Sequence, residues 1–222
     1  MTKWVELTKW ADIVYYADME IVESAGAVIG DSRREALLEA AVGVFARYGF
    51  RKASMDEVAR AAGVSRQGLY LLFADKEELF RKALTYKLTR QLSAAVVALS
   101  HAGDPLETRL IAACDEWAGQ FIGTMGADAA DLMCASTSLA GDTLTQYEAL
   151  FEKALAHAIE ASPLLNFCTA AGVLPADAAK ALHATARGLK QGCQSRQEFV
   201  RGMTAAARMF CAPLNAPASH KE

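Results

Sequence analysis

The segment Ser65-Arg66-Gln67-Gly68 places two long polar side chains at the start of a short helical pattern. Arginine can form two parallel hydrogen bonds with guanine, and glutamine can do the same with adenine. Glycine lets the backbone approach a partner closely, and a recognition helix presents its N-terminal residues to the base edges. These residues therefore predict a surface that reads double-stranded DNA. The alternative is a solvated helix on which Arg66 is a surface charge, Gln67 a helix former and Ser65 a cap.

Capping boxes mark the elements that would position this segment. In such a box a Ser or Asp caps a helix, and a Glu three residues later reaches back to its backbone. The pairs are Ser32–Glu35, Ser54–Glu57, Asp75–Glu78, Asp104–Glu107 and Ser195–Glu198. The first three outline three helices and the start of a fourth, and Gly63 supplies the left-handed corner before Ser65. This arrangement predicts a helix-turn-helix.

Composition favours an all-α protein. The chain has 222 residues, 53% of them hydrophobic, and its long runs carry Ala, Leu, Glu, Lys, Arg and Gln at helical spacing. One long helix from residue 75 to about 100 would join the helix-turn-helix to a larger helical domain. The further helices are expected near residues 105–124, 128–139, 142–161, 176–191 and 196–212.

Charge and cysteine usage restrict the partner and the compartment. The net charge is −3, yet residues 31–90 carry 12 Lys and Arg against 8 Asp and Glu, which suits a polyanion. The five cysteines are scattered and form no CxxC pair, which is typical of a reducing compartment. No stretch is long and apolar enough for a membrane span. We therefore expect a cytoplasmic protein with no membrane partner.

A family resemblance adds to this interpretation. Residues 32–82, SRREALLEAAVGVFARYGFRKASMDEVARAAGVSRQGLYLLFADKEELFRK, resemble the DNA-binding domain of TetR-family transcriptional regulators. The match covers the whole of that domain. The closing stretch GLK…SRQEFVRGMTAAARMF is similar to the last two helices of many members. The resemblance implies that the remaining chain binds a small molecule and forms a dimer.

Three further residues are candidates for phosphate contacts. Ser54 begins the second helix, where free amides favour an anion, and the resemblance implies that Tyr70 and Lys76 hold phosphates. The alternatives are that Ser54 only caps, Tyr70 lies at the core edge, and Lys76 pairs with a nearby Glu. Leu72 stands where many members carry a phosphate-binding His. It either packs inward or meets a thymine methyl group or a sugar.

The larger domain offers candidates for an apolar ligand pocket and for a dimer interface. The pocket candidates are Cys114, Trp117, Phe121, Met125, Met133, Phe151, Phe167 and Cys168. An ordinary core is the alternative for each of them. The interface candidates on the last two helices are Leu182, Thr185, Leu189, Phe199, Val200, Met203, Ala207 and Phe210. Two copies would pair these helices into a four-helix seam.

The expected domain organisation has four parts. They are an N-terminal extension at 1–30, a helix-turn-helix domain at 31–82, a ligand-binding and dimerisation domain at 83–215, and a disordered tail at 216–222. The extension is net acidic and is expected to be loosely ordered, or to come from a start upstream of the functional one; the sequence does not decide whether it belongs to the native protein.

These features predict a homodimeric, ligand-responsive DNA-binding regulator, most simply a repressor. A small apolar molecule would release it from a pseudo-palindromic operator. Two alternatives are a dimeric DNA-binding protein without a ligand and one that senses redox state through a thiol. A helical enzyme is a third. The four histidines have no HxxxH or CxxC partner, and common catalytic motifs are missing. We therefore expect no enzymatic activity, metal or cofactor.

Overall fold

The computed structural model describes residues 31–122 and 129–215. The expectations for residues 1–30 and 216–222 lie outside this range. The described residues form helices and turns, with no strand among them. Contacts divide them into an N-terminal unit of residues 31–93 and 129–148, and a C-terminal unit of residues 94–122 and 149–215. We describe each unit separately.

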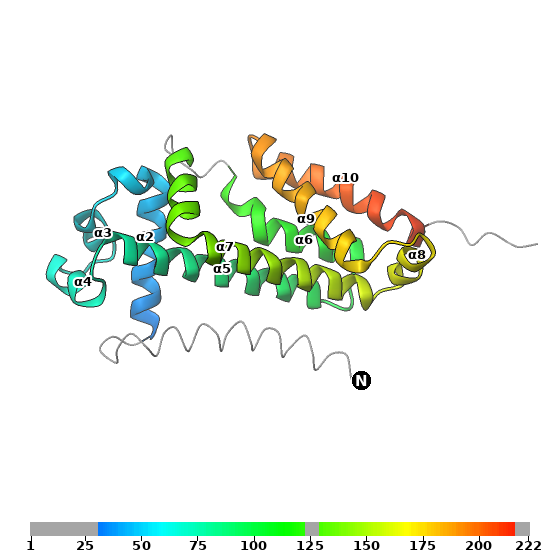
Figure 1. Ribbon diagram of the computed structural model, residues 1–222, viewed down its shortest axis with the longest axis horizontal. Helices are drawn as coiled ribbons and strands as arrows, with labels where there is room; N and C mark the ends of the chain where they lie inside the picture. The colour runs from blue at the N-terminus through cyan, green and yellow to red at the C-terminus, as the bar shows by residue number, and fades with distance from the viewer. Residues whose placement is uncertain (1–30, 123–128, 216–222) are drawn as a thin grey trace, which may run out of the picture. The chain divides into compact units, whose positions relative to one another are not determined.

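The N-terminal unit contains the predicted helix-turn-helix. Its elements are α2 (Asp31–Lys52), α3 (Met55–Ala61), α4 (Arg66–Leu72), most of α5 (Lys76–Ser100) and the first part of α7 (Ala129–Glu160). Figure 1 shows the corner between α3 and α4. The end of α2 is distorted at Gly49, whose φ of 75° lies in the left-handed region that glycine adopts without steric cost.

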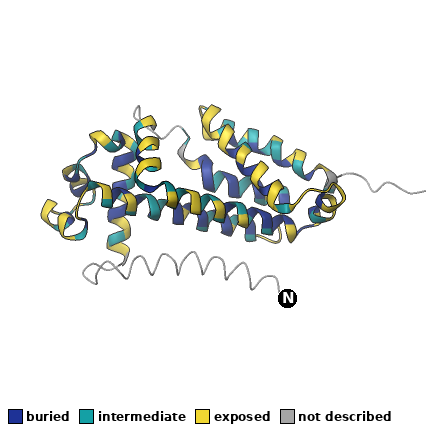
Figure 2. Ribbon diagram, viewed as in Figure 1, coloured by how far each residue is buried: buried dark blue, intermediate teal, exposed yellow. Residues whose placement is uncertain are grey.

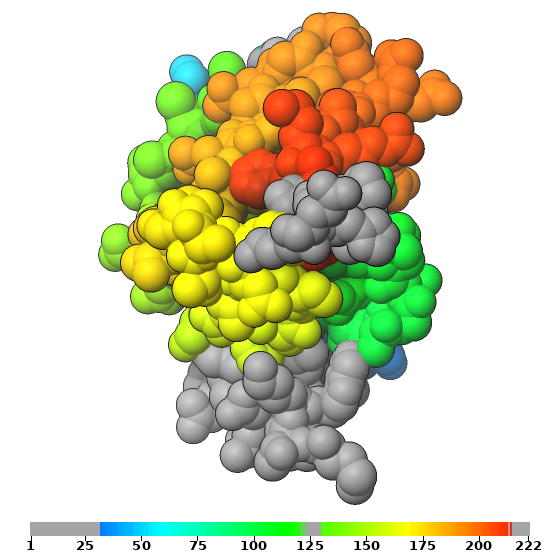
Figure 3. Space-filling view, turned by 90° about the vertical axis from the view of Figure 1, so that its right-hand side faces the viewer, coloured from blue at the N-terminus to red at the C-terminus, as the bar shows by residue number. Residues whose placement is uncertain are grey.

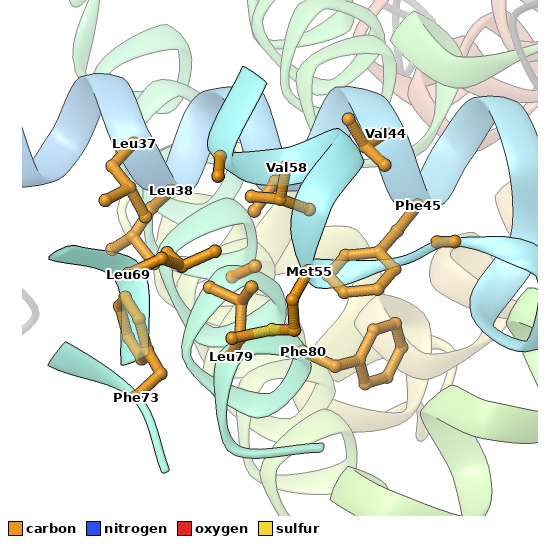
Figure 4. Packing of buried hydrophobic residues seen from close by; sticks show 14 of the residues in the cluster. Leu37, Leu38, Val44, Phe45, Met55, Val58, Leu69, Phe73, Leu79 and Phe80 are labelled. Carbon is orange, nitrogen blue, oxygen red and sulfur yellow. The ribbon is translucent and has the colours of Figure 1, made fainter. Parts of the chain in front are cut away.

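Apolar side chains from α2, α3, α4 and α5 meet in one core in this unit. Figure 4 shows Leu37 and Phe45 pointing toward the side chains of the neighbouring helices. The core also includes Leu69 and Phe73, both almost fully buried. Leu69 and Phe73 are spaced four residues apart, so they lie on one side of α4 and its C-cap and anchor the helix in this core.

The C-terminal unit is a helical bundle. Its elements are the end of α5, α6 (Leu106–Ala118), the 3₁₀ turn η1 (Gly119–Phe121), the second part of α7, α8 (Leu164–Ala170), α9 (Pro175–Gly192) and α10 (Arg196–Asn215). Helix α10 contacts α6, α8 and α9. Figure 3 shows α9 and α10, in orange and red, sharing a surface of the unit.

Three features of the helices differ from the sequence prediction. The break expected at residues 139–142 is a kink inside α7, where Ala140 has φ −148° and ψ 29°. Helix α8 lies within a stretch that the sequence presented as an irregular break. The cap expected at Asp104 does not form, because Pro105 takes the capping position without a side-chain hydrogen bond. The all-α class and the N-terminal helix-turn-helix are confirmed.

Candidate nucleic-acid interface

The chain turns from α3 into α4 at Gly63. Its φ of 65° lies in the left-handed region, which glycine adopts without steric cost. The amide of Val64 donates to the carbonyl of Ala59 at 2.9 Å and closes the end of α3. Ser65 then caps α4, because its Oγ accepts a hydrogen bond from the amide of Gly68 at 3.0 Å. The predicted corner and cap are therefore present.

Gly68 has a structural role inside α4. A Cβ atom at this position would lie 3.1 Å from the Oγ of Ser65, which is tighter than ordinary van der Waals contact. A side chain here would therefore crowd the hydrogen bond that caps the helix. The close approach of DNA to this part of the backbone stays a prediction.

The outer face of α4 carries the predicted base-reading side chains. Figure 2 shows α4 largely in the exposed colour. The exposed side chains are Arg66, Gln67, Tyr70 and Leu71. Because the buried anchor of α4 faces the opposite way, the long polar side chains at its start are held outward by the core. This is the geometry that reading a DNA groove requires.

Arg66 is oriented by two neighbours. Its Nη1 donates to Oδ2 of Asp56, on α3, at 3.0 Å. Its guanidinium carbon lies 5.6 Å from the centroid of the Tyr70 ring, within cation–π distance. The sequence pattern identified Arg66 and Tyr70 but missed Asp56, because two residues ten positions apart on different helices give no local signal.

Ser54 forms the complete capping box that the sequence predicts. Its Oγ accepts from the amide of Glu57 at 3.2 Å, while its own amide donates to Oε2 of Glu57 at 2.9 Å. The first turn of α3 also carries Asp56. Two carboxylates at this helix start oppose the approach of a phosphate. The structure therefore supports the capping role of Ser54, and its phosphate contact stays a prediction.

Lys76 is engaged within the N-terminal unit. Its Nζ donates to the carbonyls of Phe50, Arg51 and Ala53 at 2.9, 3.3 and 3.1 Å. It also lies 4.6 Å from the centroid of the Phe50 ring. An ammonium group has three N–H donors, and three carbonyls at the end of α2 receive them. The phosphate contact implied by the family resemblance would compete with these bonds.

The two leucines that follow Tyr70 have different environments. Leu72 is half-buried and packs against the core of the N-terminal unit. Leu71 is 81% exposed on the outer face of α4. The inward packing that was one alternative for Leu72 is therefore the one observed. No sequence pattern singles out Leu71, because most leucines in helices are buried in a core.

A second contact that the sequence missed links α7 to the end of α2. The backbone amide of Arg51 donates to Oδ2 of Asp131 at 2.8 Å, and Nε of Arg51 donates to Oδ1 at 2.6 Å. These hydrogen bonds lower the pKa of Asp131 below its ordinary value, and the bond from the backbone amide of Arg51 contributes most. Asp131 and Lys76 thus hold the same turn from two helices.

The pocket candidates are only partly brought together. Trp117 and Phe151 stack at 4.8 Å between ring centroids in the C-terminal unit, and Cys114 is fully buried on α6. Phe167, on α8, is 43% exposed, and Met133 is 58% exposed in the N-terminal unit. Cys168 is buried on α8. The side chain of Phe121 and the whole of Met125 lie outside the residues that the structure describes. Met133 does not belong with the others.

A buried histidine completes the group around Trp117. Nε1 of Trp117 donates to Nε2 of His183 at 3.3 Å, and Nδ1 of His183 lies 2.9 Å from Oε1 of Glu152. An indole N–H only donates, so Nε2 accepts and Nδ1 carries the proton toward Glu152. His183 is 3% exposed. This polar chain joins α6, α7 and α9, and no local sequence pattern indicates it.

The dimer-interface candidates divide into two groups. Four are fully buried within the single chain, namely Leu182, Phe199, Met203 and Ala207. The other four are half-buried, namely Thr185, Leu189, Val200 and Phe210. An amphipathic stripe on a helix marks a buried face without saying whether its own chain or another covers it. A surface for a second copy must therefore use the half-buried group and its exposed neighbours.

Three thiols of the C-terminal unit are poorly suited to redox sensing. Burial raises the pKa of Cys114 to about 12, with a further rise from Asp115. Burial likewise raises the pKa of Cys211 to about 11, and that of Cys193 in the same direction. A reactive thiol needs a lowered pKa, because the thiolate is the nucleophile. Among the described residues, no three His, Cys, Asp or Glu side chains gather as a metal site would require.

Within residues 31–122 and 129–215, every helix falls short of the length and apolarity of a transmembrane helix.

Comparisons with known proteins agree with this geometry. Residues 37–83 match the family described as bacterial regulatory proteins, tetR family. Over 54 residues, 24% of the chain, the sequence is 44% identical to the HTH-type transcriptional regulator YfiR of Bacillus subtilis (strain 168). The matched stretch covers 26% of YfiR, so the chain spans about a quarter of the length of this curated relative.

Two solved structures extend the likeness beyond the helix-turn-helix. A transcriptional regulator from Rhodococcus sp. Rha1 has a TM-score of 0.60 at 20% identity, covering 81% of this chain and 96% of its own. A TetR-like transcriptional regulator from Rhodococcus sp. RHA1 has a TM-score of 0.52 at 24% identity, covering 84% of this chain and 99% of its own. At these identities the likeness shows a shared fold.

Proposed function

We propose, from the match of residues 37–83 to the tetR family of bacterial regulatory proteins, that this chain is a DNA-binding transcriptional regulator. The observation that carries the proposal is the outer face of α4. There Arg66 and Gln67 are exposed at the start of a helix whose other side is anchored in the core by Leu69. The side chains that can recognise guanine and adenine are thus the ones available to a major groove.

Leu71 adds an apolar contact to this surface. An exposed leucine beside Gln67 on a recognition helix suits the methyl group of thymine, which lies in the major groove. Tyr70 supplies a hydroxyl for a phosphate oxygen from the same face. The proposed reading surface therefore consists of Arg66, Gln67, Tyr70 and Leu71.

A binding experiment with DNA from upstream of the protein's own gene tests the proposal. In a gel-shift series at moderate salt, the wild type should bind this DNA and resist competition by random duplex. Arg66→Ala and Gln67→Ala should each lose about tenfold in specific affinity. Arg81→Ala is the matched control, because it removes an exposed arginine from α5 and leaves α4 intact. Identical behaviour of all four proteins would contradict the reading surface.

The proposed regulator acts as a homodimer. On α10, Met209 is 79% exposed and directly precedes the half-buried Phe210. Pairing the faces of α9 and α10 across a two-fold axis would present two copies of α4 to one side of DNA, about 34–36 Å apart. The operator is then pseudo-palindromic.

Light scattering after size-exclusion chromatography tests the dimer. The wild type should elute at twice the chain mass, and Met209→Arg should elute as a folded monomer with weakened operator binding. Met133→Arg is the control, because it places the same charge at an exposed methionine of the N-terminal unit. A monomeric wild type that binds a single half-site would contradict the homodimer.

Release by a small apolar molecule is the proposed mode of control, with repression as the default state. The group around Trp117, Phe151 and His183 combines stacked rings with a polar chain, which is the mixture that ligand sites use. A ligand that binds only a conformer unable to bind DNA would shift the equilibrium toward that conformer and so lower the fraction of protein bound to DNA.

A thermal-shift screen of apolar compounds, followed by DNA release, separates the alternatives. A compound that stabilises the protein and releases DNA supports sensing. If no compound stabilises the protein, the alternative of a dimeric DNA-binding protein without a small-molecule ligand is favoured. Loss of DNA binding on mild oxidation, reversed by a reductant, would favour the thiol alternative.

A further inference from the structure

We propose that Asp56 is a positioning residue that sets base specificity by orienting Arg66 for guanine. The inference rests on the proposed function, because it concerns the same reading surface. It starts from the ion pair between α3 and α4, in which Nη1 of Arg66 donates to Oδ2 of Asp56 at 3.0 Å. The two helices are held by the same core, so the carboxylate is a fixed point for a long side chain.

The guanidinium group is held from two directions. Asp56 binds one of its ends, and the ring of Tyr70 lies 5.6 Å from its central carbon. A free arginine on a surface samples many rotamers, and binding costs the entropy of fixing them. The two contacts reduce that cost before DNA arrives.

The bond to Asp56 leaves the donors that a guanine needs. A guanidinium group has five N–H donors in a planar fork, and this bond uses one at Nη1. The edge formed by Nε and Nη2 keeps two parallel N–H groups. That edge matches the O6 and N7 acceptors of guanine in the major groove.

Exposure explains why the pair matters mainly in the complex. The side chains of Arg66 and Asp56 are 64% and 49% exposed, so water weakens their attraction in the free protein. DNA that covers α4 displaces this water, and the attraction between the two charges then strengthens. A guanine thus accepts two hydrogen bonds from an Arg66 side chain that is already oriented. Other bases lack this pair of acceptors and leave N–H groups of the guanidinium without a partner.

The carboxylate also has a cost that is independent of sequence. A negative charge close to the phosphate backbone weakens binding to every duplex. Removing it should therefore raise the affinity for random DNA while lowering the preference for the operator. Neither a purely structural role nor a purely repulsive one produces these opposite changes.

The test measures two affinities for the full-length protein. One probe is a duplex that the wild type selects from a random pool, and the other is a duplex of shuffled sequence. In Asp56→Asn, affinity for the shuffled duplex should rise about twofold, and the ratio of the two affinities should fall about tenfold. Glu77→Gln is the matched control, because it removes an exposed carboxylate that pairs with Arg81 on α5. It should leave the ratio unchanged.

A second pair of variants isolates the route through Arg66. In Arg66→Ala, the guanine preference at one position of each half-site should disappear, and adding Asp56→Asn should change the base preference no further. Equal changes in both affinities of Asp56→Asn would overturn the inference, whether both rise by repulsion or both fall with lower stability. If the wild type selects no sequence at all, the proposed function fails, and the role of Asp56 fails with it.

Discussion

In the N-terminal unit, the exposed side of α4 carries mainly polar residues and its buried side carries apolar ones. In the C-terminal unit, α9 and α10 bury apolar residues whose types would suit a dimer interface equally well. In the first case, an exposed Arg66 and a buried Leu69 can be assigned from the pattern alone. In the second, Phe199 and Met203 are fully buried within the chain. The polar residues of α4 are predicted to be exposed from their type alone. Apolar residues are predicted to be buried, but their type does not show whether the same chain or a second copy covers them.

The interiors of the two units also differ. The core of the N-terminal unit around α4 is apolar, and Lys76 and Asp131 hold the turn after α2 with hydrogen bonds at its edge. The C-terminal unit instead places a polar chain through His183 inside the bundle. The substitutions below test this contrast, starting with the largest expected effect.

Replacing His183 should be the most destabilising change. His183→Ala opens a cavity and removes the partner of Trp117 and Glu152 from a buried site. We expect a loss of about 3 kcal/mol in the free energy of unfolding. Urea unfolding followed by tryptophan fluorescence measures it. His101→Ala, at an exposed position of the same unit, should change stability by less than about 0.5 kcal/mol. Equal urea unfolding midpoints for His183→Ala and His101→Ala would show that the polar chain through His183 does not stabilise the C-terminal unit.

Lys76→Met should destabilise the N-terminal unit by about 2 kcal/mol, because three carbonyls lose a charged donor. Lys82→Met, elsewhere on α5, is the control. The salt dependence of operator binding separates the two roles of Lys76. A structural role leaves the slope of log K against log salt unchanged, while a phosphate contact reduces it by about one. Unchanged stability with a reduced slope would restore Lys76 as a phosphate ligand.

Adjacent leucines offer an internal comparison on α4. Leu71→Ala should weaken operator binding about fivefold, through loss of a thymine contact, and should change stability by less than about 0.5 kcal/mol. Leu72→Ala should do the reverse and lower stability by about 1 kcal/mol, because Leu72 packs on the core. Binding is measured by fluorescence anisotropy and stability by urea unfolding. Matching effects at both positions would show that the two sides of α4 are not distinct.

Asp131→Asn should have the smallest effect on stability, present at neutral pH and lost in acid. The pKa of Asp131 is lower in the folded protein than its ordinary value of 3.8. Its stabilisation is therefore complete above that value and disappears as the pH falls through the lower, folded-state pKa. The stability difference between wild type and Asp131→Asn should be constant from pH 5 to 7 and shrink below about pH 4. A difference as large at pH 3 as at pH 7 would contradict this origin.

Local patterns predicted most of the N-terminal unit. Gly63 and Ser65 specify a corner and a cap through backbone chemistry that acts within a few residues, and both are found as expected. The capping box at Ser54 is likewise complete. These features depend on neighbours in the sequence, so the sequence alone is sufficient to identify them.

Contacts between distant residues were out of reach. Asp56 with Arg66, Arg51 with Asp131, and Trp117 with His183 join different helices. No spacing rule links them. The irregular break that conceals α8 and the kink at Ala140 show the same limit, because packing decides whether such a stretch ends a helix.

Selection of binding sites from a pool of random duplexes tests the central claim most directly. The wild type should enrich a two-fold symmetric sequence with half-sites about one helical turn apart. Arg66→Ala/Gln67→Ala should enrich no such sequence, although it stays folded and still binds DNA weakly through charge. Enrichment of the same sequence by both proteins, or of none by the wild type, would contradict reading by α4.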